Sequence, residues 1–168
     1  NAVNMIDGID GLAGGVALIA LGSLLLFLPA GSALFLVLVG AMAALVPYLV
    51  CNLDLGPGRC KVFLGDAGSM LLGYLIVWGL IEASQAPDGL APVTALWLVA
   101  IPLMDTLAVM GRRLRQGRHP FSADRGHLHH CLARLLHSTR GALGVLLLLA
   151  SLLAGIGLVG QTRVQALH

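Results

Sequence analysis

Four aspartates in an otherwise apolar sequence are the residues best suited to carry chemistry. Asp7 and Asp10 lie in NAVNMIDGIDGLAGG, Asp66 lies in KVFLGDAGSM, and Asp105 lies in IPLMDT. The chain is 58% hydrophobic and only 11% charged, so most of it is expected to lie in lipid. Carboxylates at the margins of lipid-embedded helices are costly and usually mark a site. We therefore expect these acids to be functional.

The opening motif has the donor chemistry of a divalent-cation site. Asp7 and Asp10 are three residues apart, which predicts neighbouring positions on a helical turn. Asparagines repeat this spacing one turn earlier, and a glycine follows each acid. Hard oxygen donors suit Mg²⁺ or Mn²⁺ bridged to phosphate rather than zinc. The alternative is that Asp7 caps a helix N-terminus, where carboxylates also satisfy free N–H groups.

Asp66 lies in a Gly-Asp-Ala-Gly segment directly before an apolar run. Such an acid could cap the helix that follows. A helix N-terminus at a membrane face is also an anion site, where a carboxylate can hold a divalent cation against a phosphate. Both interpretations remain open for this motif taken alone.

The segment HPFSADRGHLHHCLARLLH contains His127, His129, His130 and Cys131. A zinc site is disfavoured, because residues one or two apart on a helix do not face one another and structural zinc sites draw separated ligand pairs. The favoured interpretation is a polar, cationic cluster that receives phosphate, sugar hydroxyls or a pyrophosphate. The alternative is a basic loop that binds anionic lipid headgroups.

The elements that must position these residues are membrane helices. The mean hydropathy is +0.91, and five stretches are long enough, or nearly so, to cross a hydrocarbon layer of ~30 Å. We predict an all-α, polytopic membrane helix bundle of about five transmembrane helices, forming a single integral membrane domain over residues 1–168. The predicted spans are Leu12–Leu28, Ser32–Val50, Ser69–Ala83, Pro92–Met110 and Ala142–Gly160.

The charge distribution predicts the topology. Nine of the ten Lys and Arg fall in the loops 51–68 and 111–141, and only Arg163 falls on the other side. Basic residues accumulate in cytoplasmic loops, so the opening motif, the Asp66 motif and the histidines are all expected at the cytoplasmic face. Asp105 precedes Arg112 by about two helical turns, ~10 Å at 1.5 Å per residue, and is expected near the same face.

These three motifs, in this order, resemble the signatures of the polyprenyl-phosphate N-acetylhexosamine-1-phosphate transferases. The resemblance covers essentially the whole chain. PFSADRGHLHH looks like the branch that uses UDP-N-acetylglucosamine to start O-antigen, enterobacterial common antigen or teichoic-acid synthesis. The branch that uses UDP-MurNAc-pentapeptide typically has three consecutive histidines followed by Phe-Glu, which this sequence lacks.

The resemblance implies a reaction and a set of residues. The phosphate of undecaprenyl phosphate attacks the β-phosphorus of UDP-GlcNAc, giving undecaprenyl-diphospho-GlcNAc and UMP with Mg²⁺ (or Mn²⁺) as cofactor. Asp10 and Asp66 are the implied metal ligands, Asp7 orients a ligand or water, and Asn52 resembles a uracil-contacting asparagine. Asp105 matches an acid of the family without an assigned role. The implied catalytic residues are Asp7, Asp10, Asp66 and His127, and the implied substrate-binding residues are Asn4, Asn52, Lys61, Arg125, His127, His129 and His130.

The resemblance also implies a multi-pass protein of the bacterial inner membrane, with its site at the cytoplasmic face. The expected partners are UDP-GlcNAc, undecaprenyl phosphate and the lipid bilayer, with no nucleic acid, and a homodimer is left open. The family has an Asp-Asp motif on an earlier cytoplasmic loop, and this sequence starts after it. We therefore expect a C-terminal part of a longer transferase, with an incomplete catalytic apparatus.

Three other functions remain as alternatives. The same chemistry could use another UDP-N-acetylhexosamine. A transporter or channel fragment would place acids deep within its spans, but only Asp105 and Glu82 are candidates, and Glu82 lies near the opposite face. A structural membrane anchor would explain the spans and leave the clustered motifs unexplained.

Overall fold

The computed structural model describes residues 1–56, 61–86, 89–119 and 126–165, and throughout these ranges the regular elements are helices. This confirms the all-α prediction. The helices are α1 (Ala2–Ile6), α2 (Leu12–Leu24), α3 (Ala33–Asn52), α4 (Gly65–Gln85), α5 (Pro92–Leu98), α6 (Ala100–Arg115), α7 (Leu128–Leu135) and α8 (Thr139–Gln165).

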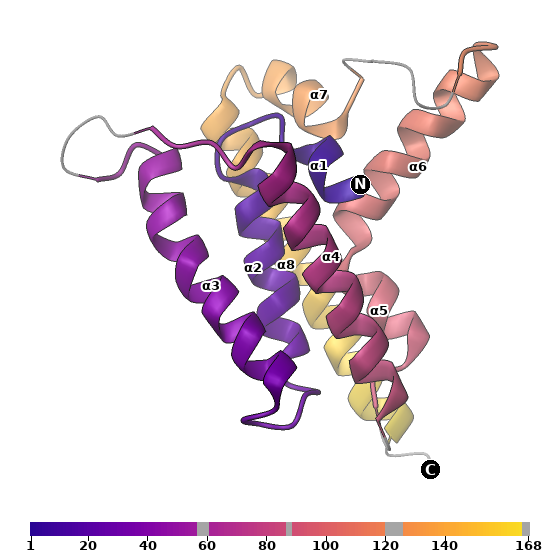
Figure 1. The fold of residues 1–168 in the computed structure, drawn as a ribbon. Coiled ribbons are helices and arrows are strands. Elements are labelled where there is room, and N and C mark those ends of the chain that lie inside the picture. The colour runs from indigo at the N-terminus through magenta and orange to yellow at the C-terminus, as the bar shows by residue number, and fades with distance from the viewer. Residues whose placement is uncertain (57–60, 87–88, 120–125, 166–168) are drawn as a thin grey trace.

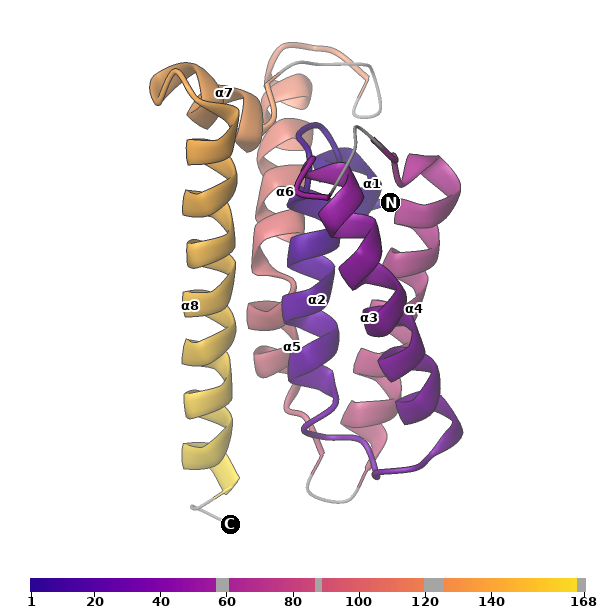
Figure 2. The ribbon, with the colours of Figure 1, turned by 90° about the vertical axis from the view of Figure 1, so that its left-hand side faces the viewer.

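Helix α2 forms the centre of the bundle and contacts α3, α4 and α8. Its side chains are almost fully buried, and Ala17, Leu21 and Leu24 have no measurable exposure. Figures 1 and 2 show that α1, α7, the connector after α3 and the end of α6 gather at one end of the bundle. The turn between α2 and α3 and the C-terminus lie at the other end.

Three helices are long and apolar enough to cross a membrane, α3, α4 and α8, and α5 with α6 makes a fourth if the pair is one bent span. These confirm a polytopic membrane helix bundle. The first predicted span, Leu12–Leu28, is shorter than expected, because α2 ends at Leu24 after 13 residues. Such a helix is ~20 Å long, less than the ~30 Å hydrocarbon layer. Its near-complete burial means that neighbouring helices, rather than lipid, surround it.

The predicted span Pro92–Met110 is formed by two helices rather than by one straight helix, because α5 and α6 are bent by 81° at Val99. Proline explains the break: Pro102 has no N–H to donate to the carbonyl of Leu98, and its ring would clash with that carbonyl. The bend sends α6 away from α5 toward the end of the bundle that contains α1 and α7 (Figure 1). Asp105, nearly two helical turns beyond the break, is thereby placed at this end and is only 4% exposed.

A buried glutamine holds α5 against α8 on the far side of the bend. The Gln161 side-chain oxygen accepts hydrogen bonds from the Ala91 N–H and from the Thr94 hydroxyl, each at 2.9 Å. Its amide nitrogen donates to the Gly89 carbonyl at 2.9 Å. Because Gln161 is only 2% exposed, these bonds satisfy polar groups that would otherwise be stranded in an apolar environment. These bonds therefore hold α5, the helix before the bend, in place against α8.

The substitution Pro102→Ala tests the origin of the bend. It restores an N–H that can bond to the Leu98 carbonyl, so α5 and α6 are expected to straighten into one helix. Spin labels at Val93 and Leu107, both exposed, should then move apart toward the ~21 Å expected for 14 residues of straight helix. An unchanged label separation would mean that tertiary packing, not the proline, causes the bend.

Candidate functional site

The first two acids lie in a loop between α1 and α2, which we call the acidic loop (residues 7–11). The helical spacing predicted for Asp7 and Asp10 is wrong, because α1 ends at Ile6 and α2 begins at Leu12. Asp7 follows the C-terminus of α1, so it is not an N-cap. Gly11 stands at the start of α2 with φ of 79°, a left-handed conformation that glycine adopts without strain.

Buried Asn52, at the end of α3, fastens the acidic loop to the segment before α4. Its side-chain oxygen accepts the Gly11 N–H at 2.6 Å, and its amide nitrogen donates to the Val62 carbonyl at 2.8 Å. Asn52 is 3% exposed and also lines both cavities of the site. The structure thus shows a positioning contact that the sequence did not indicate, while the uracil contact stays a prediction.

A second link joins α1 to the start of α4. The Ser69 hydroxyl donates to the side-chain oxygen of Asn4 at 2.7 Å, and Ser69 is fully buried. Asp66 lies in the first turn of α4, one residue after its first residue, so it is not the N-cap residue. A carboxylate in this turn is favoured by the positive end of the helix dipole. The link therefore brings the Asp66 turn close to the acidic loop.

The three carboxylates influence one another electrostatically. Burial raises the pKa of Asp7 above its usual value, and the negative charges of Asp10 and Asp66 raise this pKa further. Lys61 offsets part of the charge, because its ammonium group lies 2.8 Å from Asp10 with both side chains about half exposed. The site therefore concentrates negative charge and favours the arrival of a cation.

The donor set fits Mg²⁺ in its chemistry. Carboxylate oxygens are the hard ligands that this ion prefers, and the pKa of Asp7 is raised first by burial and then by the negative charges of Asp10 and Asp66. Among the described residues, no three acid, histidine or cysteine side chains already converge as a closed metal cage. Mg²⁺ is usually held by one or two carboxylates together with substrate phosphates and water, so Asp10 and Asp66 could hold it without a third protein ligand.

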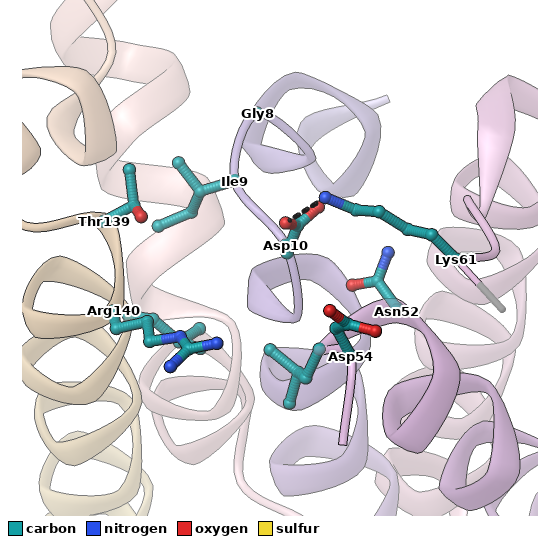
Figure 3. Close-up of a pocket in the computed structure, with 10 residues that line it drawn as sticks. Gly8, Ile9, Asp10, Asn52, Asp54, Lys61, Thr139 and Arg140 are labelled. Atoms are coloured by element: carbon teal, nitrogen blue, oxygen red, sulfur yellow. Dashed lines mark hydrogen bonds and ion pairs between the residues drawn. The ribbon is translucent and has the colours of Figure 1, made fainter. Parts of the chain in front are cut away.

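Two cavities border the acidic loop. The larger, about 330 Å³, is lined by Asp10, Asn52 and Lys61 together with Asp54 and Arg140. Figure 3 shows Lys61 reaching Asp10 from one side while Thr139 and Arg140 approach from α8 on the other. This cavity combines acids and cations, which suits a ligand that carries both phosphate and hydrogen-bonding groups.

The smaller cavity, about 120 Å³, lies beside Asp7 and contains two aromatic residues, Tyr48 and Phe63. Phe63 is 69% exposed, and the Lys61 ammonium lies 5.5 Å from its ring centroid. Sequence reasoning assigned no role to the lining residues Tyr48, Phe63, Asp54, Thr139 and Arg140. Phe63 lies three residues before Asp66 in the sequence. An aromatic residue this close to a candidate site acid was the signal that could have identified Phe63.

The histidines lie at the start of α7, which packs against the acidic loop. His127 and His129 are buried, with ring centroids 5.6 Å apart and nearly parallel planes. His129 packs against Gly8 so closely that a side chain there would collide with the imidazole. Glycine at this position therefore lets α7 approach the acidic loop.

His129 is not one of the positive charges expected of the cluster. Burial, together with the neighbouring His130 and His127, lowers the pKa of His129 to about 4, although the negative charge of Asp105 acts in the opposite direction. His129 is consequently neutral at physiological pH and serves as a packing element between α7 and Gly8. His130 lies beside it at 4.2 Å between ring centroids. Arg125, predicted to bind substrate, lies outside the described residues.

Asp105 joins this group through His127. The Nδ1 atom of His127 lies 2.8 Å from Oδ2 of Asp105, and the Leu128 N–H donates to Oδ1 at 2.6 Å. The structure thus brings Asp7, Asp10, Asp66 and the three histidines to one end of the bundle, as the topology predicted. It also places Asp105 there, buried and paired with His127.

The chain is similar to a known protein family and to individual known proteins. The model of a family described as "Glycosyl transferase family 4" matches residues 1–84. A Yersinia pestis protein named undecaprenyl-phosphate alpha-N-acetylglucosaminyl 1-phosphate transferase is 46% identical over 96% of this chain and 45% of its own length. An Escherichia coli protein of the same name is 44% identical over the same shares. No solved structure matches the chain.

A third relative of that name, from Pasteurella multocida, is 44% identical over 70% of this chain and 34% of its own length. The chain therefore spans less than half the length of these curated relatives.

The substitution Asn52→Leu tests the fastening of the acidic loop. It leaves the buried Gly11 N–H and the partly buried Val62 carbonyl without their partner, at a cost of about 1–3 kcal/mol for the buried N–H and less for the carbonyl. We expect a lower melting temperature of the full-length protein in detergent, with a smaller loss for Asn52→Asp, which keeps the acceptor for Gly11. Ser84→Ala, which removes an exposed hydroxyl at the far end of α4, should leave the melting temperature unchanged. Equal melting temperatures for Asn52→Leu and Ser84→Ala would contradict the assignment.

Proposed function

The chain belongs to glycosyl transferase family 4, and on that premise we propose that it forms much of the donor site of a membrane-bound sugar-phosphate transferase. The proposed enzyme transfers GlcNAc 1-phosphate from UDP-GlcNAc to undecaprenyl phosphate at the cytoplasmic face of a bacterial inner membrane. This would be the initiating step of O-antigen, enterobacterial common antigen or a related envelope polysaccharide. The observation that carries the proposal is the convergence of the acidic loop, the Asp66 turn and α7 at one end of a membrane helix bundle.

The relatives support the acceptor and the transferred group. Their names contain undecaprenyl phosphate and an N-acetylglucosaminyl 1-phosphate transfer, and they match nearly the whole chain. A lipid-linked acceptor fits a site at the end of a membrane bundle, because its phosphate would lie at the interface while its chain stays in the hydrocarbon layer. The excess of arginine and lysine in the connectors at this end supports the cytoplasmic orientation.

In the proposed reaction, an oxygen of the lipid phosphate attacks the β-phosphorus of the donor. The bond from that phosphorus to the oxygen bridging the two phosphates breaks, and UMP leaves with the bridging oxygen. Little covalent chemistry is required of the protein, so its task is to position both phosphates and to balance their charge. When bound, Mg²⁺ would neutralise charge on the diphosphate, and Asp10 and Asp66 would hold it.

Other side chains around the acids are proposed to bind the phosphate, to orient a ligand or water, and to contact the base. Lys61 lies beside Asp10 and can move from this carboxylate to a phosphate oxygen when a substrate enters. The negative charges of both Asp10 and Asp66 act on Asp7, which can orient a ligand or water. The exposed ring of Phe63 and the ring of Tyr48 offer apolar faces to the uracil base at the smaller cavity.

The substitution Asp66→Asn tests the proposed function in the full-length protein, assayed with UDP-GlcNAc, a polyprenyl phosphate and graded Mg²⁺. Loss of one of the two carboxylates should raise the Mg²⁺ concentration needed for UMP release and lower the maximal rate by at least ~100-fold, in line with loss of a charge-stabilising group in a phosphoryl transfer. Glu82→Gln neutralises an exposed acid at the opposite end of the same helix and is the matched control.

A transferase of this kind loses UMP release with Asp66→Asn and retains it with Glu82→Gln. Unchanged release in the Asp66→Asn variant would remove this residue from the site. A full-length protein that releases no UMP in any form would refute the proposed function. Activity with a different UDP-N-acetylhexosamine in place of UDP-GlcNAc would correct the donor alone.

A further inference from the structure

One buried carboxylate organises the start of α7. Asp105 lies in α6 and is 4% exposed, and both of its oxygens are used by residues more than twenty positions later in the chain. Oδ2 lies 2.8 Å from Nδ1 of His127, and Oδ1 accepts the Leu128 N–H at 2.6 Å. We call this group the Asp105 clamp.

The clamp selects one form of the His127 ring. A carboxylate oxygen at 2.8 Å is an acceptor, so the proton of a neutral imidazole is placed on Nδ1. Nε2 is then the unprotonated nitrogen, with a lone pair available for a hydrogen bond. A buried carboxylate that fixes tautomer and ring orientation in this way is the usual means of making a histidine act from its other nitrogen.

The clamp also fixes where α7 begins. Leu128 is the first residue of α7, and its N–H is one of the groups that no bond within the helix can satisfy. Asp105 supplies the missing acceptor from a different helix. From this anchored start, His127 stacks on His129, and His129 packs on Gly8 of the acidic loop.

We propose that Asp105 is a positioning residue for the transfer reaction. It holds His127 as the Nδ1–H tautomer and seats α7 on the acidic loop, so that Nε2 of His127 is presented to the diphosphate group of the donor. This inference rests on the proposed function for the identity of the ligand. The pairing and the tautomer are properties of the chain itself.

The proposal explains why an acid is placed in a membrane-embedded helix. A buried carboxylate is costly in lipid unless it is paired, and the partners that the structure describes, His127 and Leu128, belong to the segment that packs on the acidic loop. The break at Val99 is also accounted for, because α6 reaches α7 only after leaving the line of α5. Helix capping alone would need one oxygen, whereas Asp105 uses two.

A mutant cycle in the full-length protein tests the coupling, with kcat for UMP release measured for Asp105→Ala, His127→Ala and the double variant. If Asp105 acts through His127, Asp105→Ala should lower kcat by ~10–100-fold, the range seen for residues that orient a functional histidine. The double variant should then be no slower than His127→Ala, because the two changes remove the same contribution. Thr106→Val, a change in the adjacent residue of α6, is the control and should retain kcat and KM.

The variant Asp105→Asn separates positioning from folding. Its oxygen can still accept the Leu128 N–H, while its NH₂ group faces Nδ1 of His127 and favours the Nε2–H tautomer. We expect a melting temperature close to that of the parent protein, a lower kcat with little change in the KM for UDP-GlcNAc, and a tautomer change visible in ¹⁵N NMR of His127. If Asp105→Ala fails to fold, this variant carries the test.

The outcomes distinguish a failure of the positioning role of Asp105 from a failure of the proposed transferase function. Full kcat in Asp105→Asn, an unchanged His127 tautomer, or losses that multiply in the double variant would each overturn the positioning role. A parent protein without any UMP release would instead overturn the proposed function, and the NMR comparison would still decide whether Asp105 sets the tautomer of His127.

Discussion

The two hydrogen bonds of Asn52 are the interaction on which the rest of the site depends. They tie the start of α2 to the segment before α4, so that two acid-bearing segments far apart in sequence meet at the end of α3. Ser69 adds a second tie between α1 and α4. The side chains of Asn52 and Ser69 are both buried, and buried polar groups that are paired favour a single well-defined arrangement. The acids can therefore be held close together despite their mutual repulsion.

The mutual repulsion of the acids favours the binding of a cation at this site. Asp7 is held where burial and two neighbouring acids oppose its ionisation, and Lys61 relieves only the charge on Asp10. A fold that stores negative charge in this way gains stability when a cation or a cationic side chain arrives. The imidazole of His129, which packs on Gly8 of the acidic loop, adds no charge of its own, because burial keeps it neutral.

Composition and motifs were sufficient to predict the membrane bundle and the side of it on which Asp7, Asp66 and the histidines lie, since charges in an apolar sequence are conspicuous. Contacts between distant segments were not predictable. Nothing in the local sequence pairs Asn52 with Gly11 or Asp105 with His127. The break at Val99 could have been predicted from Pro102. The spacing of Asp7 and Asp10 misled because glycines, not helical turns, set the conformation of their loop.

The central claim is that the Asp66 turn and α7 occupy the same membrane face. Single cysteines at Ala67, Leu135 and Ala30, in a cysteine-free background of the full-length protein, can be labelled with an impermeant maleimide in intact and in permeabilised cells. All three positions are exposed. The account predicts that Ala67 and Leu135 label only after permeabilisation and that Ala30 labels in intact cells. Labelling of Ala67 and Leu135 from opposite sides of the membrane would contradict it.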